Sequence, residues 1–284
     1  MSPPSISDSH AFCRAITHKH GANFSVGFRF LPPEKRRGVY AAYAYCRWAD
    51  DIADDGGPDV AERLDEWERE LDRGYAGRPE HAITIALADS LERFPIPKAA
   101  FLDLIEGCRQ DIVKTRYATF EELLHYCHLV ASSISDISLS IFEYRSGEAI
   151  DHGRALATAL QLTNITRDVG DDLERDRIYI PAEELARFGV READLVARRP
   201  TPELERLILF QIERAEGYFR RAEPLLRELS FDARFPTLLM GSVYARVLAK
   251  IRKEPLAPLE RRVGLSTAEK VRLVAGRVFE PHFV

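Results

Sequence analysis

The stretch from Asn164 to Pro181, NITRDVGDDLERDRIYIP, constrains the fold more than any other part of the sequence. If it begins as a helix, Asn164, Asp168 and Asp172 are at i, i+4 and i+8 and share one face. Like charges at this spacing repel, so a compensating interaction is expected. Carboxylates and an amide carbonyl are hard oxygen ligands that suit Mg²⁺. Taken alone, the stretch fits a solvated helix face with salt bridges at least as well.

A second acidic cluster, Asp50, Asp51, Asp54 and Asp55, ends the segment YAYCRWADDIADD. Asp50 and Asp54 are again at i and i+4, and they follow an aromatic, helix-forming run. This order suggests the mouth of a pocket. The alternative is a helix end passing into the turn at Gly56, although four acids at a helix C-terminus oppose the macrodipole. Two carboxylate faces with arginines nearby suggest a diphosphate held by a small cluster of metal ions.

The two motifs together resemble the squalene and phytoene synthases, a family of enzymes that condense prenyl diphosphates head to head. The resemblance is carried by YAYCRWADDIAD and QLTNITRDVGDDLERDRIYIP, and it continues in FSVGFRFLPPEKRRGVYAAY, DIVKTRYATFEELLHYCHLVA, VYARVLAKI and RRVGLSTAEK. It covers the chain roughly from His20 to Lys270. Either motif alone would also fit head-to-tail prenyltransferases or terpene cyclases, whereas the pair is highly specific.

Composition excludes several other classes of protein. Charged residues make up 30% of the chain and hydrophobic residues 45%, as in a soluble globular protein. The net charge of -5 gives no reason to expect nucleic acid as a partner. The cysteines form no CxxC pair and have no histidines at zinc spacing, so we expect reduced thiols in a cytoplasmic protein. No apolar run approaches about 18 residues, and the N-terminus lacks an apolar signal core, so neither a membrane-spanning helix nor a secretory signal is expected.

The periodicity of the chain predicts an all-α fold. Apolar residues recur at helical spacing, and no segment shows sustained period-two alternation or an Asn-Gly hairpin. The resemblance implies a single-domain, isoprenoid-synthase-type arrangement of helices around a central cavity. No linker divides residues 1–284, so we expect one domain, with residues 1–9 disordered and a catalytic helical domain over about residues 10–280.

The resemblance implies roles for the acidic residues of both motifs. Head-to-head condensation ionises one allylic diphosphate, and metal ions and arginines stabilise the leaving diphosphate. A cluster of Mg²⁺ ions is the expected cofactor. The residues implied as its ligands are Asp50, Asp54, Asn164, Asp168 and Asp172. The four aspartates among them are also predicted to be catalytic. Asp51 and Asp171 rank lower, because adjacent side chains point about 100° apart on a helix.

Arginine and aromatic residues near the motifs are the predicted substrate contacts. Arg47, Arg167 and Arg177 would clamp diphosphate oxygens, although Arg47 is also placed to pair with Asp50 on its own helix. Tyr43 is the predicted aromatic catalytic residue beside Arg47, whereas Tyr45 fits a core position equally well. The other substrate-binding candidates are Phe24, Tyr126, Gln161, Tyr179, Tyr244 and Arg262. The acceptor of the proton lost on cyclopropane closure is left open among a hydroxyl, an imidazole and the diphosphate.

Two places depart from the family's pattern. A glycine-containing segment of the family reads VASSIS here, from Val130 to Ser135, and the usual leucine before the motif arginine is Thr166. Both changes add hydroxyl groups to an expected apolar wall. They therefore bear on the preferred chain length and on the step of the pathway that is catalysed.

The sequence thus predicts a Mg²⁺-dependent prenyltransferase that joins two farnesyl diphosphates through presqualene diphosphate, with squalene as the product if a second step follows. The lean to farnesyl diphosphate rests on KTRYATFEELLHYC and IFEYRSGEA, which look like bacterial members of the squalene branch. NADPH is needed only for the reductive second step, and no GxGxxG fingerprint is present.

Two alternatives remain open at this point. One is a phytoene synthase that uses geranylgeranyl diphosphate, and the other is a non-catalytic scaffold or assembly relative. The intact carboxylates of both motifs argue against the scaffold. A membrane surface is expected as a peripheral partner because the product is nearly insoluble, although the basic C-terminal third fits a solvated face equally well. The oligomeric state is not predicted.

Overall fold

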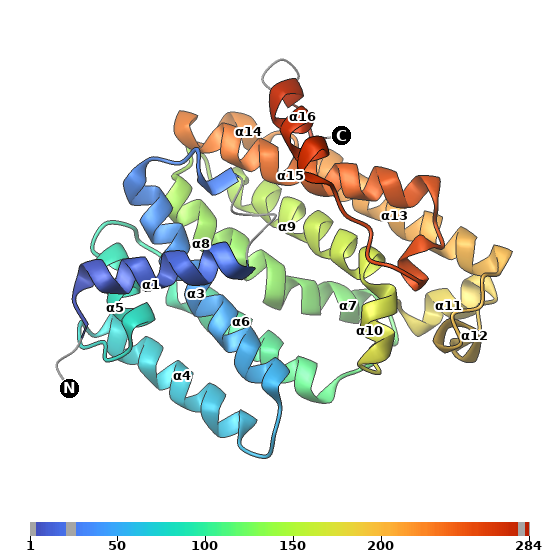
Figure 1. Ribbon diagram of the computed structural model, residues 1–284, viewed down its shortest axis with the longest axis horizontal. Helices are drawn as coiled ribbons and strands as arrows, with labels where there is room; N and C mark the ends of the chain where they lie inside the picture. The colour runs from blue at the N-terminus through green and yellow to red at the C-terminus, as the bar shows by residue number, and fades with distance from the viewer. Residues whose placement is uncertain (1–3, 21–26, 278–281, 284) are drawn as a thin grey trace. The chain divides into compact units, whose positions relative to one another are not determined.

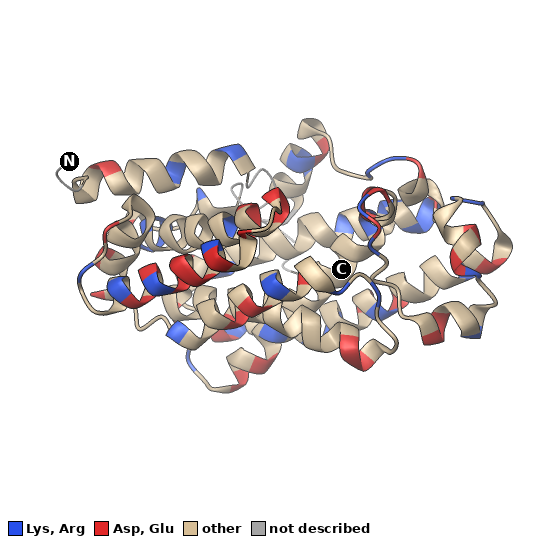
Figure 2. Ribbon diagram, turned by 90° about the horizontal axis from the view of Figure 1, so that it is seen from below, with Lys and Arg blue, Asp and Glu red and all other residues tan. Residues whose placement is uncertain are grey.

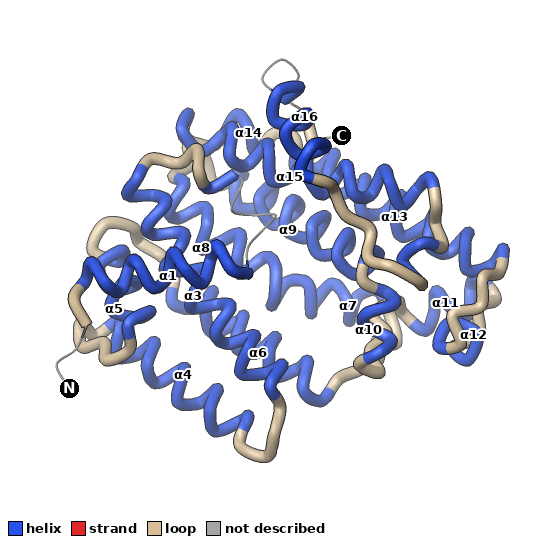
Figure 3. The backbone as a smooth tube through the Cα atoms, in the orientation of Figure 1, coloured by secondary structure: helices blue, strands red, loops and turns tan. Residues whose placement is uncertain are grey.

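Helices make up all the regular structure in the computed structural model, which describes residues 4–20, 27–277 and 282–283. Figure 3 draws no strand in this part of the chain, where the extended contacts are two isolated bridges, Arg116 with Ile178 and Tyr144 with Leu229. The all-α prediction is confirmed. Figure 2 shows acidic and basic residues interleaved along the helices.

The helices follow one another with short connections (Figure 1). Their bounds are α1 Ile6–His20, α3 Pro33–Asp55, α4 Val60–Tyr75, α5 Ala82–Leu91, α6 Lys98–Val113, α7 Phe120–Cys127, η1 His128–Ser132, α8 Ser133–Phe142, α9 Glu148–Arg167, α10 Val169–Glu174, α11 Ala182–Phe188, α12 Glu192–Val196, α13 Pro202–Ala222, α14 Leu225–Glu228, α15 Phe231–Lys253, η2 Ala257–Leu259 and α16 Thr267–Arg277. Among these, η1 is a π-helix and η2 a 3₁₀-helix.

The contacts within the chain divide it into two compact units, each built from three segments. Unit 1 comprises Met1–Val113, Ser133–Ile150 and Leu226–Thr237, and unit 2 comprises Lys114–Ser132, Asp151–Leu225 and Leu238–Val284. The first acidic motif therefore belongs to unit 1 and the second to unit 2. The expected single domain and central cavity stay predictions.

Helix α3 is the centre of unit 1 and contacts α1, α4, α5, α6 and α8. It begins at Pro33, where the fixed φ of proline suits a first turn, and it ends before Gly56, whose φ of 64° favours glycine. Tyr45 is fully buried on α3, stacks on Trp67 at 4.7 Å and donates its hydroxyl to the Trp67 carbonyl. Tyr45 is thus a core residue.

Unit 2 carries the second motif at the junction of α9 and α10. The motif does not lie on one uninterrupted helix, because α9 ends at Arg167 and the backbone of Asp168 leaves helical dihedrals (φ -102°, ψ 12°). Two backbone bonds nevertheless keep the spacing of one turn, from Asp168 N to Asn164 O and from Asp172 N to Asp168 O, each 2.8 Å. The predicted i, i+4, i+8 register is therefore retained through the break.

The N-terminal expectation is wrong for residues 6–9, which belong to α1 rather than to a disordered segment. Ser5 Oγ accepts a hydrogen bond from Asp8 N at 3.2 Å and donates to Asp8 Oδ2 at 2.7 Å. The Ser5 hydroxyl thereby satisfies one of the open backbone donors of the first turn, as an N-cap side chain does. Ser9 is fully buried, which holds the first turn against the rest of unit 1. Residues 1–3 lie outside the described part.

Candidate active site

Two guanidinium groups hold the carboxylate of Asp168 in unit 2. Arg167 Nε donates to Oδ1 at 2.8 Å and its Nη2 donates to Oδ2 at 2.5 Å. Arg262 approaches from the segment after η2, with Nε 3.0 Å from Oδ1 and Nη2 3.4 Å from Oδ2. The Arg167 side chain is 6% exposed and that of Arg262 is 61% exposed. Arg167 is thus fixed in the protein, whereas Arg262 can leave for solvent at little cost.

Tyr244 supports Arg167 from α15. It is buried and hydrogen-bonds the Arg167 side chain, which brings a third predicted substrate contact to the same place. Burial raises the pKa of the Tyr244 hydroxyl, and the positive charge of Arg167 opposes the rise. The neighbouring Thr166 donates its hydroxyl to Leu162 O at 2.7 Å. The hydroxyl that replaces the family's leucine is therefore satisfied within its own helix.

Asp172 lies in surroundings that disfavour its negative charge. Burial raises its pKa to about 7, the charge of Asp168 adds to the rise, and Arg177 and Arg175 oppose it. The predicted residue Arg177 is therefore placed beside this carboxylate. A pKa this high means that nearby positive charge does not offset the cost of burying the ionised carboxylate, and a bound cation would offset it.

Asn164 has an orphaned oxygen. Its Nδ2 donates to Oε1 of the predicted residue Gln161 at 3.4 Å, whereas its buried Oδ1 has no hydrogen-bond partner among the described residues. Buried polar atoms without a partner are rare and call for an explanation. A hard cation would supply one, because amide and carboxylate oxygens are the ligands that Mg²⁺ prefers.

Two residues that the sequence did not single out hold the motif in place. Gly170 packs so closely against η2 that an added Cβ would lie 2.8 Å from Pro258 O and 2.9 Å from Leu259 O. Arg198 donates to Gly170 O at 2.8 Å and to Glu174 at 2.9 Å. The glycine inside an acidic helix was the only sequence signal for this contact. The contact of Gly170 with η2 joins α10 to the segment that carries Arg262.

The predicted residues Tyr126 and Tyr179 are brought together in a cluster of buried aromatic rings. They stack at 5.3 Å with their hydroxyl oxygens 3.5 Å apart. Tyr117, which the sequence did not single out, lies 5.6 Å from Tyr126 and 5.7 Å from Tyr179. Lys114 lies 4.7 Å above the Tyr117 ring. Such stacked faces can exclude water and stabilise positive charge.

The first motif ends α3 in unit 1. Arg47 pairs with Asp50 at 2.8 Å and with Asp51. The structure thus shows the pairing within the helix that the sequence analysis gave as the alternative to diphosphate binding. The buried Nε of Arg47 has no hydrogen-bond partner among the described residues. Desolvation raises the pKa of Asp50 to about 6, Arg47 opposes the rise, and Asp54 and Asp111 add to it. Asp111 comes from α6 and was missed, because only the packing of α6 on α3 brings it near.

The remaining predicted residues are Tyr43 and Phe24. Tyr43 is half-buried on α3. Desolvation lowers the pKa of the neighbouring Arg47, whereas Asp51, Asp50 and, to a smaller extent, Tyr43 raise it, and the net shift is upward. Phe24 lies outside the described residues.

Burial raises the pKa of the thiols of Cys46 and Cys108 near Asp50, so they are inert packing groups rather than ligands.

The donor atoms of the two motifs suit Mg²⁺, but their side chains are not gathered into a complete set of ligands. In the described residues no three or more His, Cys, Asp and Glu side chains are close enough together to hold a metal ion. In the second motif the two arginines also take up both oxygens of Asp168. The chemistry of the donors therefore fits the ion, while the closed geometry requires a rearrangement of side chains.

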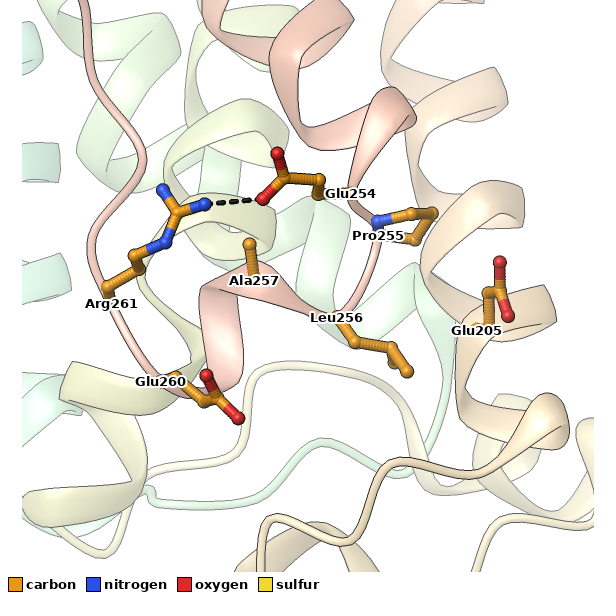
Figure 4. Close-up of a pocket in the computed structure, with 7 residues that line it drawn as sticks. All are labelled: Glu205, Glu254, Pro255, Leu256, Ala257, Glu260 and Arg261. Carbon is orange, nitrogen blue, oxygen red and sulfur yellow. Dashed lines mark hydrogen bonds and ion pairs between the residues drawn. The ribbon is translucent and has the colours of Figure 1, made fainter.

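A surface pocket of unit 2 is lined by part of η2 and by the residues just before Arg262. Figure 4 shows its lining, with Arg261 and Glu254 paired across it. The lining residues are Glu205, Glu254, Pro255, Leu256, Ala257, Glu260 and Arg261. None of them is a predicted site residue, and an acidic lining does not suit a diphosphate.

Comparisons with known proteins find relatives over nearly the whole chain. The family profile described as Squalene/phytoene synthase matches residues 17–269. The 15-cis-phytoene synthase of Synechocystis sp. is 37% identical over 283 residues, covering 94% of this chain and 83% of that protein. The crystal structure of squalene synthase HpnC from Alicyclobacillus acidocaldarius has a TM-score of 0.84 at 33% identity, covering 89% of this chain and 96% of that one. A dehydrosqualene synthase in complex with a ligand has a TM-score of 0.89 at 29% identity, covering 95% of each chain.

These similarities decide between the classes of function left open by the sequence. The helical fold matches those of isoprenoid synthases, and the relatives are enzymes rather than scaffolds. In the described residues every helix is too short or too polar to cross a lipid bilayer. The chain belongs to the squalene/phytoene synthase family and is a prenyltransferase that condenses prenyl diphosphates head to head.

Proposed function

We propose that this protein is a phytoene synthase, which joins two geranylgeranyl diphosphates head to head through a cyclopropylcarbinyl diphosphate. The observation that carries the choice of substrate is the 37% identity over 94% of the chain to a 15-cis-phytoene synthase. A second phytoene synthase, from Synechococcus elongatus, is 36% identical over the same share of the chain. The comparisons thus favour the C20 alternative over the farnesyl reading of the sequence.

Enzymes of the family typically use Mg²⁺, and we assign its ligands to the two acidic motifs. Asp50 and Asp54 would hold ions in unit 1, and Asn164, Asp168 and Asp172 would hold ions in unit 2. Bound Mg²⁺ would neutralise the charge that develops on the leaving diphosphate. The high pKa values of Asp50 and Asp172 and the orphaned Asn164 oxygen support the assignment, because each marks a charge or lone pair without compensation.

Arg262 would act as an exchangeable counter-ion for Asp168. Its guanidinium contacts both carboxylate oxygens, which an ion would also need. Because Arg262 is exposed and Arg167 is buried, Arg262 is the one that would leave when a cation binds. Once released, its planar group could donate to diphosphate oxygens instead. Arg167 would stay on Asp168 and orient it, held in turn by Tyr244.

Aromatic rings would protect the carbocation formed when the diphosphate leaves. The stacked side chains of Tyr126 and Tyr179 present faces that can stabilise positive charge without reacting with it. Their burial excludes water, which would otherwise quench the cation to an alcohol. The group that accepts the proton on ring closure is not assigned.

The second candidate is a synthase of the squalene branch that uses farnesyl diphosphate. It is favoured by the match to squalene synthase HpnC at 33% identity and a TM-score of 0.84, and by the dehydrosqualene synthase with a TM-score of 0.89. The metal-binding and arginine roles would be the same. NADPH would be required only if the reaction continued to squalene.

Product analysis distinguishes the two candidates. Purified protein with Mg²⁺ is given geranylgeranyl or farnesyl diphosphate, each with and without NADPH, and products are extracted and identified by mass. We expect phytoene from the C20 substrate, independent of NADPH, with a higher kcat/KM than for the C15 substrate. Presqualene diphosphate, dehydrosqualene or squalene as the main product would select the second candidate. Asp168→Asn serves as the inactive control for products of contaminating enzymes.

A further inference from the structure

Four large aromatic side chains in the described part of unit 1 are exposed to solvent, and three of them, apart from Phe12 on α1, come from segments that meet around the start of α15. Phe231, the first residue of α15, is 84% exposed, Phe30 is 49% exposed and Tyr144 is 41% exposed. Isolated exposed apolar residues are ordinary, but a group on one surface usually marks a binding site.

These residues lie on one continuous surface. Tyr144 pairs with Leu229 in an isolated antiparallel bridge, and Ser230 N donates to Glu143 O at 3.0 Å, two bonds that place Tyr144 beside the start of α15. Phe30 meets Phe235 edge to face at 5.0 Å. Phe231 and Phe235 are one helical turn apart on α15, so they face the same side. In Figure 1 the segment before α3 lies beside α14 and the start of α15.

A buried lysine fixes this surface from beneath. The ammonium of Lys35 donates to Phe142 O at 3.1 Å and to Ser230 Oγ at 2.9 Å, and it pairs with Asp232 at 2.9 Å and Glu143 at 2.7 Å. One charged group thus ties α3 to both segments that present the aromatic residues. The single positive charge of Lys35 is shared between these two carboxylates, so it offsets one of their two negative charges.

Five arginines give this surface an excess of positive charge. Arg29, Arg145 and Arg227 are exposed, and in the described residues none of their guanidinium groups has an ion pair. Arg36 and Arg234 donate to the backbone carbonyls of Arg29, Leu229 and Arg227 rather than to carboxylates. Carbonyl contacts satisfy hydrogen bonds but leave the charge uncompensated. The surface therefore combines exposed aromatic rings with unpaired guanidinium groups.

We propose that this aromatic-arginine surface docks the enzyme onto an anionic lipid bilayer. Aromatic side chains are stable at the boundary between headgroups and acyl chains, and arginines attract anionic lipids while binding their phosphates. The five arginines and Lys35 outnumber the acids beside them, which are Asp232, Glu143 and Glu228. The partner is a membrane surface and not a membrane interior, and the site does not depend on the length of the prenyl substrate.

Vesicle sedimentation tests the proposal with the full-length protein. The bound fraction is measured on vesicles of phosphatidylcholine with phosphatidylglycerol and on vesicles of phosphatidylcholine alone. We expect binding to the anionic vesicles, a loss of about tenfold in affinity for Phe231→Ser and of about fivefold for Arg227→Gln. Val113→Ser and Arg78→Gln are the matched controls, because both residues are exposed in unit 1 outside this surface.

Three outcomes would overturn the proposal. The first is no binding of the unaltered protein to anionic vesicles. The second is an equal loss for Val113→Ser and Phe231→Ser, which would show that any exposed apolar residue contributes. The third is a dimer in sedimentation velocity that Phe231→Ser converts to a monomer without changing vesicle binding, which would assign the surface to a second copy of the chain.

Discussion

The guanidinium of Arg262 occupies the carboxylate of Asp168, with Nε 3.0 Å from Oδ1 and Nη2 3.4 Å from Oδ2. Asp168 is at the same time held by the buried Arg167, so both of its oxygens are taken. A cation can bind there only after one arginine leaves. This relationship makes Arg262 a competitor of the metal in the free protein and a ligand of the diphosphate once displaced.

Replacing Arg262 should therefore strengthen the binding of Mg²⁺ in the absence of diphosphate. Removal of a partly exposed ion pair is worth up to about 1 kcal/mol, so Arg262→Gln should tighten Mg²⁺ binding by about two- to fivefold in a calorimetric titration. The same variant should form product more slowly. Arg261→Gln is the matched control, since the neighbouring Arg261 pairs with Glu254. Weaker or unchanged Mg²⁺ binding in Arg262→Gln would contradict the exchange.

Asp172 should cost stability at neutral and alkaline pH. Its folded-state pKa of about 7, caused first by burial and then by Asp168, is above the unfolded value of about 3.9. Between these values the folded state retains a proton that the unfolded state has lost, so the free energy of unfolding falls as pH rises and stays low above pH 7.

In chelator, Asp172→Asn should therefore unfold at a higher temperature than the unaltered protein at pH 8, by about 2–4 °C for each kcal/mol gained. The gap should close as the pH falls towards 4. Asp171→Asn, at the exposed neighbour, is the control. An equal gap at both pH values, or an equal gain for Asp171→Asn, would show that Asp172 bears no special cost.

Gly170 should tolerate no side chain. A Cβ there would lie 2.8 Å from Pro258 O and 2.9 Å from Leu259 O, both backbone atoms that cannot turn aside. We expect Gly170→Ala to lower the free energy of unfolding by about 1–3 kcal/mol in urea titrations, as overpacking does. Gly276→Ala in α16 has nothing within 4 Å and should be neutral or slightly stabilising. Equal stability of the two variants would be inconsistent with the close contact.

The ring of Tyr179 should matter more than its hydroxyl. Tyr179→Phe keeps the face that stacks on Tyr126 at 5.3 Å and Tyr117 at 5.7 Å, whereas Tyr179→Leu removes it. A cation-π contribution of about 0.5–2 kcal/mol predicts a fall in kcat of about 2- to 30-fold for leucine and a small change for phenylalanine. A larger loss in Tyr179→Phe than in Tyr179→Leu would transfer the role to the hydroxyl.

Features set by neighbouring residues were predictable from the sequence. Pro33 at the start of α3 and Gly56 after its end are local signals for the bounds that this helix has in the structure. The capping pair of Ser5 and Asp8 was an equally local signal that the sequence analysis did not use, which is why the start of α1 was missed.

Features set by tertiary packing could not be predicted in the same way. Asp111 raises the pKa of Asp50 only because α6 packs on α3, and Arg198 reaches Gly170 from 28 residues away. The pairing of Arg262 with Asp168 crosses 94 residues. The sequence indicated which residue types serve the site, whereas the competition between arginine and metal follows from the side-chain contacts.

The central claim is that both acidic motifs serve one head-to-head condensation. The most direct measurement is the rate of product formation from geranylgeranyl and farnesyl diphosphate by Asp50→Asn and Asp168→Asn, with circular dichroism to verify folding and Asp55→Asn as an exposed acidic control. The account predicts that each motif variant loses at least about 100-fold in kcat, as expected when stabilisation of a leaving group is removed, while the control stays active. Full activity in either folded motif variant would contradict it.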